Sequence, residues 1–251
     1  MSVFIETIKS YYEKFPRSYW AIISGIFGLS FIIVAALLHS ITEPISFFTH
    51  WVSSLGWGPN GSEPVFRIGI MVLGCLLIPY ILSLTRYLWR EKEEDKSRSM
   101  KILLISAFVS SAVALVGLFF VSIFGNIAQE GFFLHLLGAV TFFAMTTGLM
   151  VLYTVSMMLC GKKSKIQQLC TLIVVIFFIS MVISATPVIS NYTVFDLLNS
   201  FIVKTPGERV AFLASIVPLS TWLTFFEWMV TFSFCAWFII TGGYTLKIEK
   251  A

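Results

Sequence analysis

The chain has 251 residues, of which 57% are apolar and only 12% are charged, and its mean hydropathy is +0.90. Soluble globular domains carry roughly 25% charged residues, so this composition excludes an ordinary soluble domain. Long apolar runs of the length of a bilayer crossing indicate instead an all-α, multi-pass integral membrane protein.

The net charge of +4 does not indicate nucleic-acid binding. Many of the basic residues lie in the 86–101 loop, where they are interleaved with Glu91, Glu93, Glu94 and Asp95. This mixture is typical of a solvated loop beside anionic lipid. The expected partners are therefore membrane lipids, with other membrane proteins as a second class.

Four cysteines, Cys75, Cys160, Cys170 and Cys235, lie within or at the ends of apolar runs. No CxxC pair or histidine at zinc-finger spacing accompanies them, so they are interpreted as small packing residues. The sequence predicts no metal site and no cofactor.

Residues 1–17 are polar, but Phe4, Ile8, Tyr11 and Phe15 recur within them at helical spacing. Two interpretations remain open for this segment: a short helix on the cytoplasmic membrane surface, or a frayed terminus.

A single transmembrane domain is predicted over residues 18–245, with a cytoplasmic tail at 246–251. It contains six candidate spans, at about 18–39, 65–86, 102–124, 133–159, 168–190 and 212–241. Each is long enough to cross a hydrocarbon core of about 30 Å at a rise of about 1.5 Å per residue. The expected fold is a six-helix transmembrane bundle.

The basic residues predict the orientation of this bundle. Fourteen of them fall on the side that holds both termini, and only Arg67, Lys204 and Arg209 fall on the other. The positive-inside rule therefore places both termini in the cytoplasm.

The first loop on the opposite, outer side is dense in turn-forming residues, with Gly56, Gly58, Pro59, Gly61 and Pro64 in twelve positions. This density predicts a tight, fixed path in place of a helix. The approach to the loop is bracketed by His39 and His50.

Two N-glycosylation sequons, Asn60-Gly-Ser and Asn191-Tyr-Thr, fall on the same outer side. They are acceptors only if the source is eukaryotic or archaeal.

Glu227 is a lone carboxylate in the last predicted span. A charge at bilayer depth costs from about 3 to more than 10 kcal/mol, so the side chain must face a partner or a cavity. Ser220, Thr224 and Thr231 share its helix face at spacings of four, three and four. We expect this stripe to face the bundle, with its hydroxyls bonding the carboxyl group.

Two interpretations of Glu227 remain open. The residue is either a site for a lipid headgroup, a cation or a proton, or a hydrogen-bonded structural glutamate that specifies packing.

His135 lies one turn before Gly138 and Ala139, where small residues allow a second helix to approach closely. It is a candidate general base, metal ligand or interfacial hydrogen-bonding residue. Arg67 is a candidate for binding a phosphate headgroup, with snorkelling to the interface as the alternative. Both residues are expected within a turn of the outer surface, whereas Glu227 is expected about 22 Å deep by helical rise.

Two sets of site residues follow. The catalytic candidates are His135 and Glu227. The ligand-binding candidates are Arg67, His50, Asn60, Glu63, His135, Ser220, Thr224, Glu227 and Thr231.

Three stretches resemble the DRAM-like family, which contains damage-regulated autophagy modulators, the FGF-receptor-activating-protein group and GPI-anchor remodelling factors. Residues 50–67 resemble its first outer loop, with Ser54 where the family has an aspartate. Residues 135–139 are similar to its His-x-x-Gly-Ala segment, and residues 226–228 to its Glu-Trp segment. The first two stretches also resemble an uncharacterised six-span family of bacteria and archaea.

The DRAM-like resemblance implies six spans and a link to lipid organisation, GPI-anchor remodelling or autophagy. The favoured function is binding or organising membrane lipid through an outward-opening pocket. One alternative is a lipid-modifying enzyme, an acyl or headgroup hydrolase or transferase that uses His135 and Glu227. The other is a small proton- or cation-coupled transporter that uses Glu227.

Overall fold

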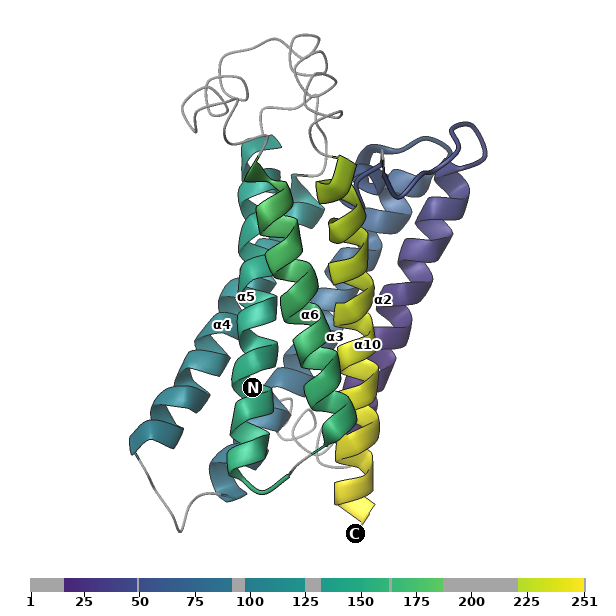
Figure 1. Cartoon of the computed structure of the whole chain (residues 1–251). Coiled ribbons are helices and arrows are strands. Elements are labelled where there is room, and N and C mark those ends of the chain that lie inside the picture. Colours follow the sequence, from purple (N-terminus) through teal and green to yellow (C-terminus); the bar gives the residue numbers. More distant parts are fainter. Residues whose placement is uncertain are drawn as a thin grey trace.

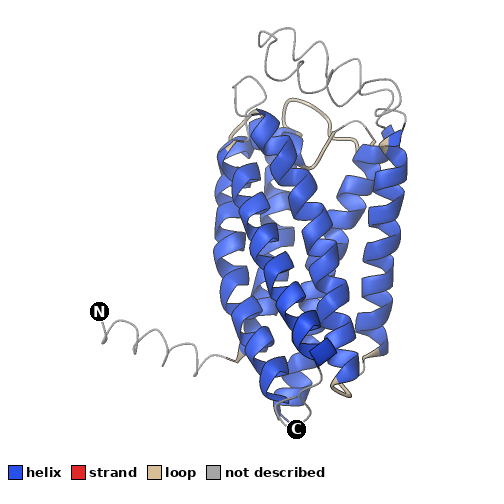
Figure 2. Ribbon diagram, turned by 90° about the vertical axis from the view of Figure 1, so that its left-hand side faces the viewer, coloured by secondary structure: helices blue, strands red, loops and turns tan. Residues whose placement is uncertain are grey.

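The computed structural model describes residues 16–48, 50–91, 98–124, 132–162, 164–186 and 221–250. These ranges hold no strand, and their long helices are α2 (Arg17–His39), α3 (Ser62–Glu91), α4 (Arg98–Ile123), α5 (Phe132–Leu159), α6 (Lys165–Ser184) and α10 (Thr221–Lys250). A 3₁₀ helix, η1 (Ser53–Trp57), lies between α2 and α3 (Figures 1 and 2). Six of these helices are long and apolar enough to cross a membrane, which confirms the predicted fold class.

The helix boundaries differ most from the prediction at the C-terminal end. The last span was expected to end near 241, but α10 continues to Lys250 and includes most of the predicted tail. The helix continues through Gly242. A β-carbon at this position would come within 2.7 Å of the Ser18 carbonyl oxygen and 3.0 Å of the Ala21 side chain. This glycine permits close packing of α10 on α2.

Three further predictions lie wholly or mostly outside the described residues. They are the surface segment at 1–17, of which the structure describes only Pro16 and Arg17, the sequon at Asn191, and Ser220.

Helices α2 and α10 run antiparallel along much of their length. Gly25 of α2 lies against the Cys235 carbonyl and Ile239 of α10, and Gly242 of α10 lies against Ser18 of α2. The beginning of α2 and the end of α10 are therefore at the same end of the bundle, as Figure 1 shows for the two helices. This agrees with termini on one side of the membrane, and the cytoplasmic assignment stays a prediction.

The opposite end of the bundle, which we call the η1 end, is closed in part by the segment between α2 and α3. Leu55 of η1 is completely buried, and Val52 just before it is 4% exposed. Asn60 takes a positive φ of 55°, and its amide donates to the Leu38 carbonyl and the Thr42 hydroxyl. The path is tight, as predicted, but the expected absence of helix is wrong, because η1 occupies Ser53–Trp57 and α3 begins at Ser62. Glycine and proline shorten the helical pieces here without preventing them.

Candidate functional site

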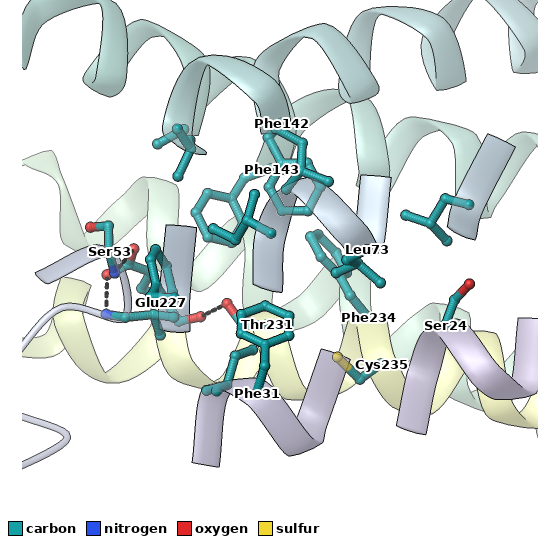
Figure 3. Close-up of a pocket in the computed structure, with 18 of the residues that line it drawn as sticks. Ser24, Phe31, Ser53, Leu73, Phe142, Phe143, Glu227, Thr231, Phe234 and Cys235 are labelled. Carbon is teal, nitrogen blue, oxygen red and sulfur yellow. Dashed lines mark hydrogen bonds between the residues drawn. The ribbon is translucent and has the colours of Figure 1, made fainter. Parts of the chain in front are cut away.

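The Glu227 carboxylate caps the first turn of η1. Its Oε2 accepts a hydrogen bond of 3.1 Å from the Val52 backbone N–H, and its Oε1 accepts one of 3.4 Å from the Ser53 N–H (Figure 3). The first N–H groups of a helix have no acceptor inside it, and η1 has no capping side chain of its own. Glu227 of α10 therefore supplies the acceptors that the first backbone N–H groups of η1 lack.

Neighbouring contacts fix the same segment on α10. The indole N–H of Trp228 donates to the His50 carbonyl at 2.7 Å. The Phe47 ring meets the Trp228 ring edge-on at 5.1 Å, and the Phe48 ring stacks on Phe225 at 5.1 Å. The described residues 47, 48 and 50–53, which we call the docking segment, are thus attached to α10 by both hydrogen bonds and aromatic packing.

The position of Glu227 differs from the expected one. The sequence predicted a carboxylate about 22 Å below the outer surface by helical rise, remote from the residues of that side. In the structure Glu227 is six residues after Thr221, where α10 begins, and the docking segment descends to meet it. The expected remoteness from the loop is wrong, because Val52 and Leu55 are buried and the loop does not stay at the surface. The depth of Glu227 in the membrane stays a prediction.

The described part of the polar stripe, which consists of Thr224, Glu227 and Thr231, faces the bundle, but the two threonine hydroxyls do not bond the carboxylate. Thr224, Glu227 and Thr231 are all at most 9% exposed. The Thr224 hydroxyl donates to the Thr221 carbonyl at 2.8 Å, and the Thr231 hydroxyl to the Glu227 carbonyl at 2.7 Å. A threonine hydroxyl in a helix commonly donates to the backbone carbonyl one turn back. These two threonines form that bond in place of the predicted bond to the Glu227 carboxyl group.

A cavity of about 60 Å³ lies beside Glu227. It is lined by side chains of α2, α3, α4, α5 and α10 and, at one end, by Val52 and Ser53. Its walls include Phe31, Leu73, Phe142 and Phe234 (Figure 3). Glu227 and Thr231 belong to the lining, yet the accessible wall is entirely apolar, since their polar atoms are bonded elsewhere.

Arg67 binds the end of a neighbouring helix. Its Nε donates to the Ser122 carbonyl at 2.8 Å and one terminal nitrogen to the Ile123 carbonyl at 2.6 Å. The other terminal nitrogen forms an ion pair of 2.9 Å with Glu63. The Ser122 hydroxyl donates back to the Arg67 carbonyl at 2.8 Å. The guanidinium thus caps α4, a role that neither predicted interpretation included.

His135 lies at the crossing of α4 and α5. Its Nδ1 is 3.2 Å from the Val121 carbonyl oxygen, and the residue is 2% exposed. The predicted close helix approach is present here, because a β-carbon on Gly138 would lie 2.7 Å from the Gly117 carbonyl oxygen. His135 does not line the cavity, so the structure does not bring the two catalytic candidates to one site.

The ligand-binding candidates are dispersed over several places. Only Glu227 and Thr231 line the cavity. Asn60 links the loop to the end of α2, Glu63 pairs with Arg67, and His50 lies in the docking segment.

The partners of Glu227 were not predictable from the sequence pattern. These are backbone N–H groups of Val52 and Ser53, and a side-chain pattern does not display backbone donors. The sequence held only an indirect signal. A lone intramembrane acid requires a hydrogen-bond partner, and a loop rich in glycine and proline has backbone N–H groups that require acceptors.

Residues 26–243 match the family described as Protein of unknown function (DUF998). This is most of the chain. The protein belongs to the DUF998 family. No curated protein and no solved structure matches it. Membership of DUF998 agrees with the resemblance to an uncharacterised six-span family, and the DRAM-like resemblance stays a prediction.

Proposed function

We propose that this DUF998 protein binds membrane lipid by taking hydrocarbon into the cavity beside Glu227. The observation that carries the proposal is the apolar accessible wall, which offers dispersion contacts and no polar partner. Empty apolar cavities in proteins stay dry and accept apolar ligands. A hydrocarbon chain in a bilayer is the abundant ligand of that chemistry.

The size of the cavity limits what enters. A volume of 60 Å³ accommodates about four to six water-sized groups at roughly 10–15 Å³ each. A stretch of a few methylene groups fits this space, while a headgroup lies outside it.

The enzyme and transporter alternatives receive less support from the geometry. An acid–base pair needs both groups within reach of one substrate, and His135 does not line the cavity that Glu227 borders. A proton or cation carrier needs an accessible carboxylate, and both Glu227 oxygens accept bonds from the docking segment.

The test is mass spectrometry of the lipids that remain bound after mild detergent purification. In the variant Ala139→Leu, three added carbons project from a residue that lines the cavity. The matched control is Val140→Leu at the next position, which is 60% exposed on the outer face of α5. We expect several-fold less retained lipid in Ala139→Leu and no change in Val140→Leu.

Equal lipid retention in the two variants would exclude binding at this cavity. Turnover of the retained lipid that is lost in both His135→Ala and Glu227→Gln would favour the enzyme. Flux into liposomes that Glu227→Gln abolishes would favour the transporter.

A further inference from the structure

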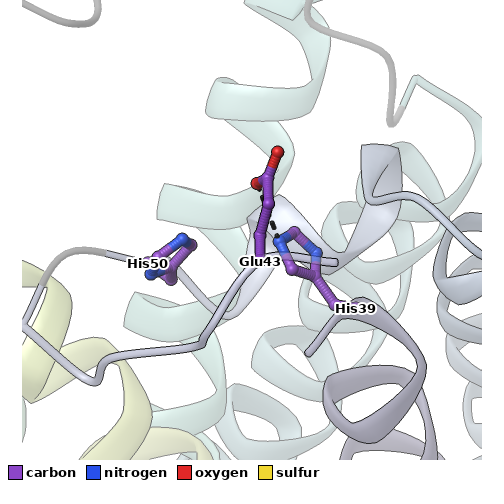
Figure 4. Close-up of side chains that lie close together, drawn as sticks. All are labelled: His39, Glu43 and His50. Carbon is purple, nitrogen blue, oxygen red and sulfur yellow. Dashed lines mark ion pairs between the residues drawn. The ribbon is translucent and has the colours of Figure 1, made fainter. Parts of the chain in front are cut away.

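Three potential metal ligands converge at the η1 end, outside the cavity. His39 ends α2, Glu43 follows one turn later, and His50 belongs to the docking segment (Figure 4). One ligand atom from each residue lies within 4.8 Å of the other two. His39 and His50 account for two of the three histidines in the chain.

His39 is the residue that indicates a ligand. It is 4% exposed, and within the described ranges neither of its ring nitrogens has a hydrogen-bond partner. Nε2 faces the Glu43 carboxylate at 3.5 Å, beyond ordinary hydrogen-bond length. Its partner among the described residues is Glu43, through this long ion pair. A buried polar group without a hydrogen bond costs about 1–3 kcal/mol, and a metal ion on Nε2 would offset that cost.

The backbone holds His39 and Glu43 on one face. The Glu43 N–H donates to the His39 carbonyl at 3.3 Å, which continues the helical path beyond α2 and aligns side chains four residues apart. Gly58 packs against the His39 ring, and a β-carbon there would overlap Nδ1. The ring is therefore fixed with Nε2 toward Glu43.

His50 is oriented by two contacts of its own. Its Nδ1 accepts a hydrogen bond of 3.2 Å from the Ser46 N–H, and its carbonyl accepts the Trp228 indole N–H. The His39 and His50 rings lie 5.6 Å apart, centroid to centroid, at 77°. A metal ion on His50 Nδ1 replaces the hydrogen bond from the Ser46 N–H. A metal ion on Nε2 favours the tautomer that is protonated at Nδ1, which also loses that bond.

We propose that His39, Glu43 and His50 bind one divalent transition-metal ion, with Zn²⁺ the best fit. Two imidazoles and a carboxylate suit Zn²⁺ and related ions, whereas Mg²⁺ and Ca²⁺ prefer oxygen ligands alone. Zn²⁺ takes nitrogen and oxygen ligands at about 2.0–2.2 Å in a tetrahedron, which places them about 3.3–3.6 Å apart. A shift of about 1–1.5 Å closes the cluster to that geometry.

The His39 Nε2–Glu43 distance of 3.5 Å already fits this geometry, so the shift shortens the distances to His50. The Glu43 side chain is 65% exposed and adjusts without repacking of the bundle. The fourth coordination position then faces the η1 end and takes a water molecule, as in zinc sites with three protein ligands.

Such an ion joins α2 to the docking segment, which is itself attached to α10. His39 belongs to α2, and His50 is bonded to Trp228 of α10. Binding of the ion therefore stabilises the attachment of α2 to the docking segment, by the mass-action effect of a ligand specific for the folded state. This proposal is independent of lipid binding, because none of the three ligands lines the cavity.

The experiment uses the full-length protein in detergent, with any purification tag removed and the sample first treated with a chelator. Co²⁺ is added as a spectroscopic probe, Zn²⁺ displaces it, and elemental analysis gives the metal content. We expect one ion per chain, a visible Co²⁺ ligand-field spectrum that Zn²⁺ abolishes, and a higher melting temperature with Zn²⁺.

Glu43→Gln is the decisive variant, because its exposed side chain is not needed for folding. We expect Co²⁺ affinity to fall at least about tenfold in this variant. Replacing residues that only support metal ligands already lowers metal affinity by about tenfold or more. His39→Gln and His50→Ala should lose the spectrum. The controls are Glu63→Gln, which changes another glutamate near the η1 end, and His135→Asn, which changes the third histidine. Both should keep the Co²⁺ spectrum.

Two results would overturn the proposal. One is the absence of a Co²⁺ spectrum and of a Zn²⁺-dependent melting shift in the wild-type chain. The other is a spectrum of equal strength in Glu43→Gln and His50→Ala, which would place the ion elsewhere and leave the cluster a structural ion pair.

Discussion

Arg67 is a charged residue near the η1 end whose role is decided by the backbone of another helix. The last carbonyls of α4 have no acceptor role inside their own helix, and Arg67 donates to those of Ser122 and Ile123. The sequence predicted either a phosphate-headgroup site or snorkelling to the interface for this residue. The partner is a main-chain group 55 residues away, and no side-chain pattern encodes it.

Replacing Arg67 by Gln should lower the free energy of unfolding by about 1–3 kcal/mol, because two carbonyls lose a charged donor. Glu63→Gln is the matched control: it removes the ion pair but leaves both carbonyl bonds, and should cost less than about 1 kcal/mol. Thermal unfolding in a neutral detergent measures both. If Arg67→Gln matters only when anionic lipid is added, the headgroup role is favoured over capping.

At the scale of elements, close helix contacts determine how the bundle is packed. Gly117 of α4 and Gly138 of α5 face each other so closely that their backbones are in contact. Without a hydrophobic driving force between helices in lipid, small residues give the tightest van der Waals packing. The sequence predicted this role for Gly138, although it did not identify α4 as the partner.

Gly138→Ala should destabilise the protein by about 1–3 kcal/mol, since its β-carbon would lie 2.6 Å from the Phe120 β-carbon. Gly148→Ala, on the same helix, has its nearest neighbour at 4.0 Å and should be neutral or slightly stabilising. Unfolding of both variants in detergent is the measurement. Equal effects would show that α4 and α5 are not in close contact at Gly138.

At the scale of the whole molecule, the six spans were predictable and the site was not. Apolar length and charge asymmetry follow from the solvent properties of the bilayer, and each residue contributes to them independently. The capping of η1 by Glu227 depends on a backbone that folds inward, and the His39–Glu43–His50 cluster depends on a loop that returns to α2. Such features require three-dimensional information that a linear pattern lacks.

The orientation in the membrane is a further prediction at this scale. Epitope tags at the two ends of the chain should both be inaccessible in intact cells and both accessible after permeabilisation, because fourteen basic residues lie on the side of the termini. Labelling of either tag in intact cells would contradict the charge asymmetry.

The central claim is that Glu227 holds the docking segment on α10. Hydrogen exchange of the Val52 and Ser53 amides, measured by mass spectrometry, tests it most directly. In Glu227→Gln, an NH2 donor replaces one of the two acceptor oxygens and leaves a buried N–H unsatisfied, at about 1–3 kcal/mol. This should speed the exchange about fivefold to a hundredfold, with α4 and α5 unchanged. Thr231→Val, which removes only a bond within α10, should leave it unchanged. Equal exchange in Glu227→Gln and the wild-type protein would contradict the account.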